Sequence, residues 1–175
     1  MSSLERLALL RQKASPKCTE AVPMIDVVSP ESRSRMMSGI RGKDTKPEMI
    51  VRKALFAAGY RFRLHRRDLP GVPDVVLPGR KIALFVHGCF WHMHTKCKYC
   101  KLPSTRPEFW QAKLSGNVER DQMAIKALMS SGWRVLTVWE CTTRNTAALA
   151  TLQKALVTWI ESGATLGEIS GVNTD

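Results

Sequence analysis

The sequence of 175 residues has no apolar run that approaches the 18 residues needed to cross a membrane. Its first residues also lack the form of a secretory signal peptide, because Glu5, Arg6 and Arg11 interrupt the leucines. Acidic residues are scarce, since 15 Asp and Glu stand against 27 Lys and Arg, a formal net charge of +12. These shortages argue against a membrane-spanning or secreted protein. The excess of positive charge favours a polyanionic partner, most often nucleic acid, over the alternative of a cationic protein at a membrane surface.

The length and a hydrophobic content of 44% predict one globular domain with a sizeable core. The positive charge is concentrated in its first two thirds, because only Asp44 and Glu48 oppose the many basic residues of 33–67. We expect three parts along the chain: a flexible N-terminal extension (1–30) interrupted by prolines, the folded domain (31–162) and a C-terminal tail (163–175).

Apolar periodicity predicts an α/β fold. A helix is expected to begin near Asp44 or Thr45 and to end at Gly59. The remaining elements are predicted, in order, as strands at 60–64, 75–77 and 82–86, a loop at 87–107, a helix at 108–131, a strand at 135–139 and a helix at 147–160. The continuous apolar run of 82–86 is typical of a central strand that is buried on both faces. The order predicts a mixed sheet with helices packed on it.

Potential metal ligands are concentrated in the segment 87–100, which contains three of the four His and three of the five Cys residues. An odd number of cysteines, with histidines among them, does not suit a disulfide framework. Zinc explains the cluster better than a set of unrelated thiols and imidazoles, because thiolate and imidazole are its preferred ligands. The loop offers six candidates and Cys141 is a seventh. His87 and His92 could instead transfer protons or contact phosphate.

A carboxylate and several aromatic residues accompany this loop. Asp74 begins a short strand, and the next strand leads directly to His87, so both side chains are expected at one edge of the sheet, where a carboxylate can hold Mg²⁺. The alternative for Asp74 is a turn cap. Phe90 and Trp91, with Trp110 beyond the loop, can stack on bases or wedge between them, or can fill a small core around zinc.

Five segments together resemble the very short patch repair (Vsr) family of DNA mismatch endonucleases. They are His-Gly-Cys-Phe-Trp-His (87–92), Pro-Gly-Val-Pro-Asp (70–74), Arg-Pro-Glu-Phe-Trp (106–110), Asn-Val-Glu-Arg-Asp (117–121) and Gly-Trp-Arg-Val-Leu-Thr-Val-Trp-Glu-Cys (132–141). The resemblance runs in the right order from about Ser32 to Arg144. It implies a restriction-endonuclease-like fold and a Mg²⁺-dependent nick beside the thymine of a T:G mismatch, which arises when 5-methylcytosine deaminates.

The resemblance also implies roles for individual residues. Asp74 and the backbone carbonyl of Val86 would hold Mg²⁺, and His92 would be the general base. His87 and Glu48 would support the active site, with Asn117 and Asp121 as their neighbours. Structural zinc would be held by Cys89, His94, Cys97 and Cys141, and the residues wedged into DNA would be Met37, Phe90, Trp91 and Trp110. The partner would be mismatched duplex DNA, with mismatch-repair proteins as further candidates. The protein would be a monomer of the bacterial cytoplasm, associated with the nucleoid.

Two alternatives to this function and one to the zinc ligands follow from the residues. A zinc-stabilised DNA-binding module would explain the charge and the loop but would leave Asp74 without a task, and a restriction-type nuclease would cut fully paired DNA. On spacing alone, Cys100 could replace Cys97 or Cys141. We favour Cys141, because a ligand at the end of a central strand would tie the loop to the sheet.

Overall fold

The computed structural model describes residues 29, 31–32, 35 and 42–171. The N-terminal extension, apart from residue 29, and the predicted wedge residue Met37 lie outside the described residues. In the described part of the chain, no helix has both the length and the apolar character needed to cross a bilayer.

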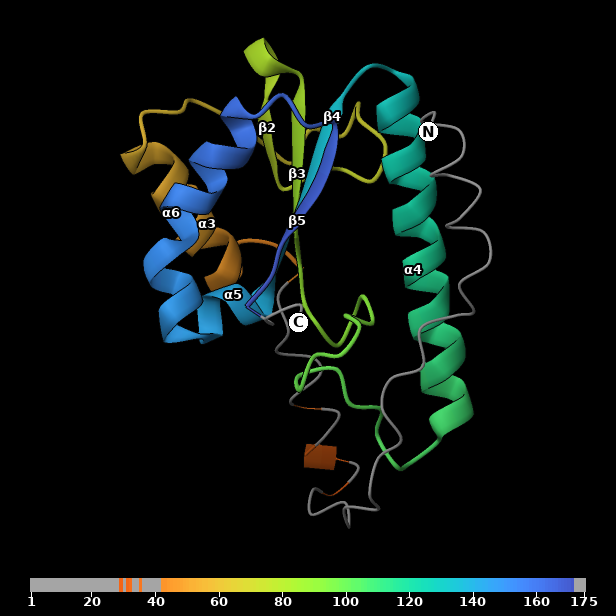
Figure 1. The fold of residues 1–175 in the computed structure, drawn as a ribbon. Helices are drawn as coiled ribbons and strands as arrows, with labels where there is room; N and C mark the ends of the chain where they lie inside the picture. The colour runs from red at the N-terminus through yellow and green to blue at the C-terminus, as the bar shows by residue number, and fades with distance from the viewer. Residues whose placement is uncertain (1–28, 30, 33–34, 36–41, 172–175) are drawn as a thin grey trace.

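A five-stranded mixed sheet forms the centre of the molecule (Figure 1), in the order β1-β2-β3-β4-β5. The strands are β1 (Arg63–Leu64), β2 (Val75–Leu77), β3 (Ile82–His87), β4 (Arg134–Trp139) and β5 (Leu166–Ile169). Strand β2 pairs antiparallel with both β1 and β3, whereas β3, β4 and β5 run parallel to one another. A mixed sheet of this kind confirms the predicted α/β class and fits a restriction-endonuclease-like fold.

Helices cover both faces of the sheet (Figure 1). They are α3 (Lys46–Ala57), α4 (Pro107–Ser130), α5 (Glu140–Arg144) and α6 (Thr146–Glu161), with a 3-10 turn, η2, at Pro78–Arg80. Helices α3 and α6 pack together on one face, and α4 lies on the other. The predicted start of α3 is confirmed, because the Thr45 side chain accepts a hydrogen bond from the Glu48 amide and the Glu48 carboxylate accepts one from the Thr45 amide.

The strand residues alternate between two cores, as the pleat requires. In β3, Ile82 and Leu84 belong to the larger core beneath α3 and α6, while Ala83 and Phe85 pack beneath α4 with Leu128. The apolar run of 82–86 is therefore a central strand buried on both faces, as predicted. This arrangement fixes the carboxyl ends of β3 and β4, from which the site is built.

Three predictions about elements need correction. Of the predicted strand 60–64, only Arg63–Leu64 pair with the sheet. Tyr60 and Phe62 are not part of strand β1, but their side chains pack against the larger core. A short helix, α5, precedes α6. Residues 163–175 are not simply a tail, because Leu166–Ile169 pair with β4 as strand β5, so the sheet extends beyond residue 162.

Candidate active site

A cavity of about 1140 Å³ lies at the carboxyl end of β3. Its wall includes most of the residues predicted to act in catalysis or to touch DNA: Glu48, Asp74, Val86, His87, Phe90, Trp91 and His92. Asn117 and Asp121, from α4, line it as well. The fold thus brings together side chains that are far apart in the sequence.

Asp74 reaches the cavity because the residue before β2 lies beside the end of β3. Its Oδ2 accepts a hydrogen bond of 2.7 Å from the Val86 amide. Burial raises the pKa of Asp74 to about 6, the Val86 hydrogen bond opposes this change, and the nearby charge of Glu48 adds to it. The hydrogen bond from Val86 fixes the position of this carboxylate, and a cation nearby would stabilise its charged form.

Glu48 belongs to a buried ion-pair network beside Asp74. Arg52 donates to Glu48 Oε2 at 2.7 Å and to Asp44 Oδ1 at 2.6 Å. Arg52 Nη2 also lies 3.0 Å from His65 Nε2. Because an arginine can only donate, His65 Nε2 is the acceptor and the proton of the neutral ring is on Nδ1. That nitrogen lies 3.9 Å from Asp74 Oδ1.

His87 and His92 form the opposite side of the site, together with Asp121. The two imidazole rings stack with centroids 3.8 Å apart. Burial lowers the pKa of His87 to about 3, and the neighbouring His92 adds to this effect, so His87 is neutral at pH 7. His92 Nδ1 lies 2.5 Å from Asp121 Oδ2. A proton on Nδ1 leaves Nε2 of His92 as the basic nitrogen.

The aromatic residues form one cluster, and two of its members line the cavity. Phe90, Trp91 and Trp110 meet edge to face, with centroids 5.1 to 6.2 Å apart. All three side chains are partly exposed, and Phe90 and Trp91 line the cavity itself. Contact with bases and packing in a small core both have a basis here, since Phe90 and Trp91 also pack against the core around the cysteines.

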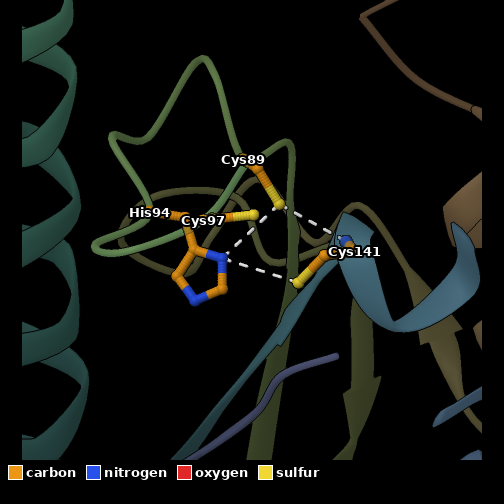
Figure 2. Close-up of side chains that lie close together, drawn as sticks. All are labelled: Cys89, His94, Cys97 and Cys141. Atoms are coloured by element: carbon orange, nitrogen blue, oxygen red, sulfur yellow. Dashed lines mark hydrogen bonds between the residues drawn. The ribbon is translucent and has the colours of Figure 1, made fainter. Parts of the chain in front are cut away.

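The side chains of Cys89, His94, Cys97 and Cys141 converge, as Figure 2 shows. One candidate ligand atom from each lies within 4.8 Å of the others, and all four residues are buried. His94 Nδ1 is 3.5 Å from the sulfurs of both Cys89 and Cys141. Cys100 is buried but is not a member of this group. Three thiols and an imidazole at these separations could hold a metal ion.

The thiols of this cluster do not titrate alike. A hydrogen bond from the Cys89 thiol lowers the pKa of Cys141 to about 3, with further donors from His94, Gly171 and Ser170. The same bond and burial raise the pKa of Cys89. Burial also raises the pKa of Cys97. The hydrogen bonds around Cys141 therefore favour its thiolate form over those of Cys89 and Cys97.

The structure thus places all the predicted catalytic residues in the wall of one cavity and brings the four predicted zinc ligands together in one cluster. It adds His65, which the sequence reasoning did not single out. The register of β1 and β2 places it there, because Leu64 lies opposite Val75 and the antiparallel pairing then carries His65 to Asp74. Asp44 and Arg52, which connect His65 to Glu48, were also not predicted as site residues.

Comparison with known proteins points to one family. Residues 25–99 match the family model described as DNA mismatch endonuclease Vsr. The chain is 50% identical over 126 residues to the type II nicking enzyme V.XorIIP of Xanthomonas oryzae, covering 72% of this chain and 92% of that protein. It is 42% identical over 139 residues to the DNA mismatch endonuclease Vsr of Escherichia coli, covering 78% and 88%. The type II nicking enzyme V.NmeAIP of Neisseria meningitidis is 40% identical over 124 residues, covering 71% and 88%.

Proposed function

Since the chain belongs to the Vsr family of DNA mismatch endonucleases, we propose that this endonuclease nicks duplex DNA beside the thymine of a T:G mismatch, with Mg²⁺ as its cofactor. Such a mismatch arises when 5-methylcytosine deaminates. The observation that carries the proposal is that Asp74 and the His92–Asp121 pair line the same cavity. A carboxylate for a metal and an oriented base are the groups that phosphodiester hydrolysis requires.

The residues around Asp74 fit Mg²⁺, which prefers carboxylate and carbonyl oxygens. Asp74 Oδ2 is engaged by the Val86 amide, and Oδ1 faces the cavity side where His65 lies. We assign Asp74 and the carbonyl of Val86 as the ligands, with Glu48 and His65 beside them. Bound Mg²⁺ would stabilise the negative charge that develops on the phosphate and on the leaving oxygen.

His92 is the general base of this proposal. Its Nδ1 proton is held by Asp121, so Nε2 can accept a proton from the attacking water. His87 stacks on the His92 ring and, being neutral, adds no charge that would oppose protonation of His92. Asn117 donates to the Trp91 carbonyl at 3.0 Å and so connects α4 to the loop that carries His92.

The aromatic cluster supplies the selectivity for a mismatch. Phe90, Trp91 and Trp110 would wedge between bases beside the T:G pair, and Met37 would do so from the N-terminal part of the chain. Opening a mismatched pair costs less free energy than opening a normal one, so wedging favours the mismatch.

Cys89, His94, Cys97 and Cys141 would hold structural zinc in this proposal. Their donor set is the Cys₃His type that zinc prefers, and their burial leaves no open position for substrate. The zinc would fasten the loop that carries His92 and Trp91 to the ends of two central strands. It therefore acts on the reaction only by holding these side chains in place.

A nicking assay tests the proposed function. We expect a single-strand cut beside the thymine of a T:G duplex with Mg²⁺, no cut with EDTA, and little cutting of a matched C:G duplex. Equal cutting of both duplexes would indicate a restriction-type nuclease. Binding of both duplexes without any cut would indicate a non-catalytic DNA-binding module.

Removal of the base is expected to slow the reaction without loss of binding. His92→Ala should lower the nicking rate by about 10²- to 10⁴-fold, the usual contribution of a general base. Asp121→Asn should slow it as well, because the proton on His92 Nδ1 loses its carboxylate. The matched control is Asp68→Asn, which removes an exposed carboxylate paired with Arg66. Nicking by His92→Ala at the wild-type rate would remove His92 from the mechanism.

Removal of a wedge is expected to reduce discrimination. Base stacking on an aromatic ring contributes about 1–3 kcal/mol, so Trp91→Ala should lower the preference for T:G over C:G duplexes by roughly 5- to 150-fold. Phe56→Ala is the control, since Phe56 is exposed on α3 and does not line the cavity. Titration of both duplexes by fluorescence anisotropy measures the preference. Equal losses on the two duplexes would show that Trp91 only supports the loop.

A further inference from the structure

The chain that follows β5 contacts the Cys₃His group directly. The Gly171 amide donates to the Cys141 sulfur at 3.3 Å, and Ser170 Oγ lies 3.3 Å from His94 Nε2. Ser170 Oγ is also 3.7 Å from the Cys141 sulfur. His94 of the loop and Cys141 of α5 are therefore both contacted by residues from a third segment of the chain.

The contact with Ser170 bears on the proton of His94. Nδ1 of His94 points at the sulfurs, so a metal among them would need the lone pair of that nitrogen. The ring proton must then be on Nε2, where the Ser170 hydroxyl is the acceptor. The Trp139 ring stacks on His94 with centroids 4.0 Å apart, so it holds the face of the imidazole while Ser170 holds its edge. A partner on the second nitrogen is the usual way in which a ligating histidine is oriented.

Further contacts hold this segment against α5. Thr142 Oγ1 donates to the Ile169 carbonyl at 3.2 Å, and Asn145 Nδ2 donates to the Gly171 carbonyl at 3.3 Å. At Gly171 the approach leaves no room for a side chain, because a Cβ there would lie 2.5 Å from the Cys141 carbonyl oxygen. The close contact that lets the Gly171 amide reach the Cys141 sulfur thus requires glycine.

We propose that Ser170 and Gly171 are positioning residues of the metal centre, which orient His94 and support the Cys141 thiolate. Docking of β5 on β4 and binding of the metal then stabilise each other. This inference rests on the proposed zinc site. It gives the C-terminal strand a task that its short, partly exposed sequence does not suggest.

The test measures zinc affinity in the full-length protein by competition with a chromogenic chelator. Ser170→Ala should bind Zn²⁺ about 10- to 100-fold more weakly than the wild type, the usual effect of removing the partner of a ligating histidine. Ser170→Thr keeps the hydroxyl and should restore most of the affinity. Gly171→Ala should also weaken binding. Ser162→Ala is the matched control, because among the described residues the Ser162 hydroxyl bonds to the Trp159 carbonyl and the Ala164 amide, at the end of α6 and in the turn that follows it.

Hydrogen exchange gives a second measurement that does not depend on the variants. Removal of zinc from the wild type should speed exchange in residues 164–171 more than in β3. Unchanged affinity in Ser170→Ala and Gly171→Ala, with normal zinc uptake by the wild type, would overturn this inference alone. A wild type that takes up no zinc would overturn the zinc assignment and this inference with it.

Discussion

Asp74→Asn is expected to abolish Mg²⁺-dependent nicking and, at the same time, to raise the melting temperature of the metal-free protein at pH 7.5. Activity is lost because an amide is a poor ligand for Mg²⁺ compared with a carboxylate. Stability rises because Asn keeps an oxygen that can accept the Val86 amide while it removes a buried charge.

The pH dependence of this stability change follows from the pKa of Asp74, which burial raises from 3.8 to about 6. Between these two values the folded chain keeps a proton that the unfolded chain has released. Stability therefore falls as the pH rises through this window, and the cost levels off above pH 6 at no more than about 3 kcal/mol. The gain from Asp74→Asn should be present at pH 7.5 and nearly absent at pH 4.

Asp68→Asn is the control, because Asp68 is an exposed carboxylate outside the cavity wall. Nicking assays and thermal unfolding at pH 4 and pH 7.5 provide the measurements. The wild type should also need more Mg²⁺ below pH 6, where protons compete for Asp74. Persistent nicking by Asp74→Asn would remove Asp74 from the metal site. A lower melting temperature at pH 7.5 would show that the folded protein depends on the charge.

Cys141→Ser is expected to lose zinc and to unfold at a markedly lower temperature. When free zinc is about 1,000 times the dissociation constant, binding stabilises the folded state by about 4 kcal/mol. For a chain of this length that is roughly 8–16 °C in melting temperature. The loss of stability should be large because a metal bound to Cys141 would link the loop that carries His92 to the end of β4.

Cys100→Ser is the matched variant, since Cys100 is as buried as Cys141 but lies outside the group of four. It should keep its zinc. Metal content by mass spectrometry and melting curves with and without a chelator distinguish the two variants. Full zinc in Cys141→Ser, with loss in Cys100→Ser, would place the site wholly within the loop.

Local sequence patterns predicted the α/β fold class, which the structure confirms, and a metal site, which remains a proposal. The apolar run of 82–86 and the helical period after Thr45 depend on local burial patterns, and both were found where they were predicted. The cluster of His and Cys residues in 87–100 indicated a metal because no other chemistry explains it as well. These features are local, so their residues are close together in the chain.

Which of these residues meet depends on how the strands pair. On spacing alone Cys100 competed with Cys141. The parallel pairing of β3 with β4 sets His87 opposite Trp139, so Cys89 and Cys141, each two residues further on, leave adjacent strand ends together. In the same way, the antiparallel register of β1 and β2 brought His65 to Asp74.

Strand β5 shows most clearly that contacts between distant segments specify structure that local sequence does not. Leu166-Gly167-Glu168-Ile169 is short, contains glycine and lies at the edge of the sheet, so it has little local preference for a strand. Its conformation comes from hydrogen bonds to β4 and from contacts with α5, which are more than twenty residues away in the chain. Register and strand order are properties of the assembled sheet, and a single sequence does not contain them in any local pattern.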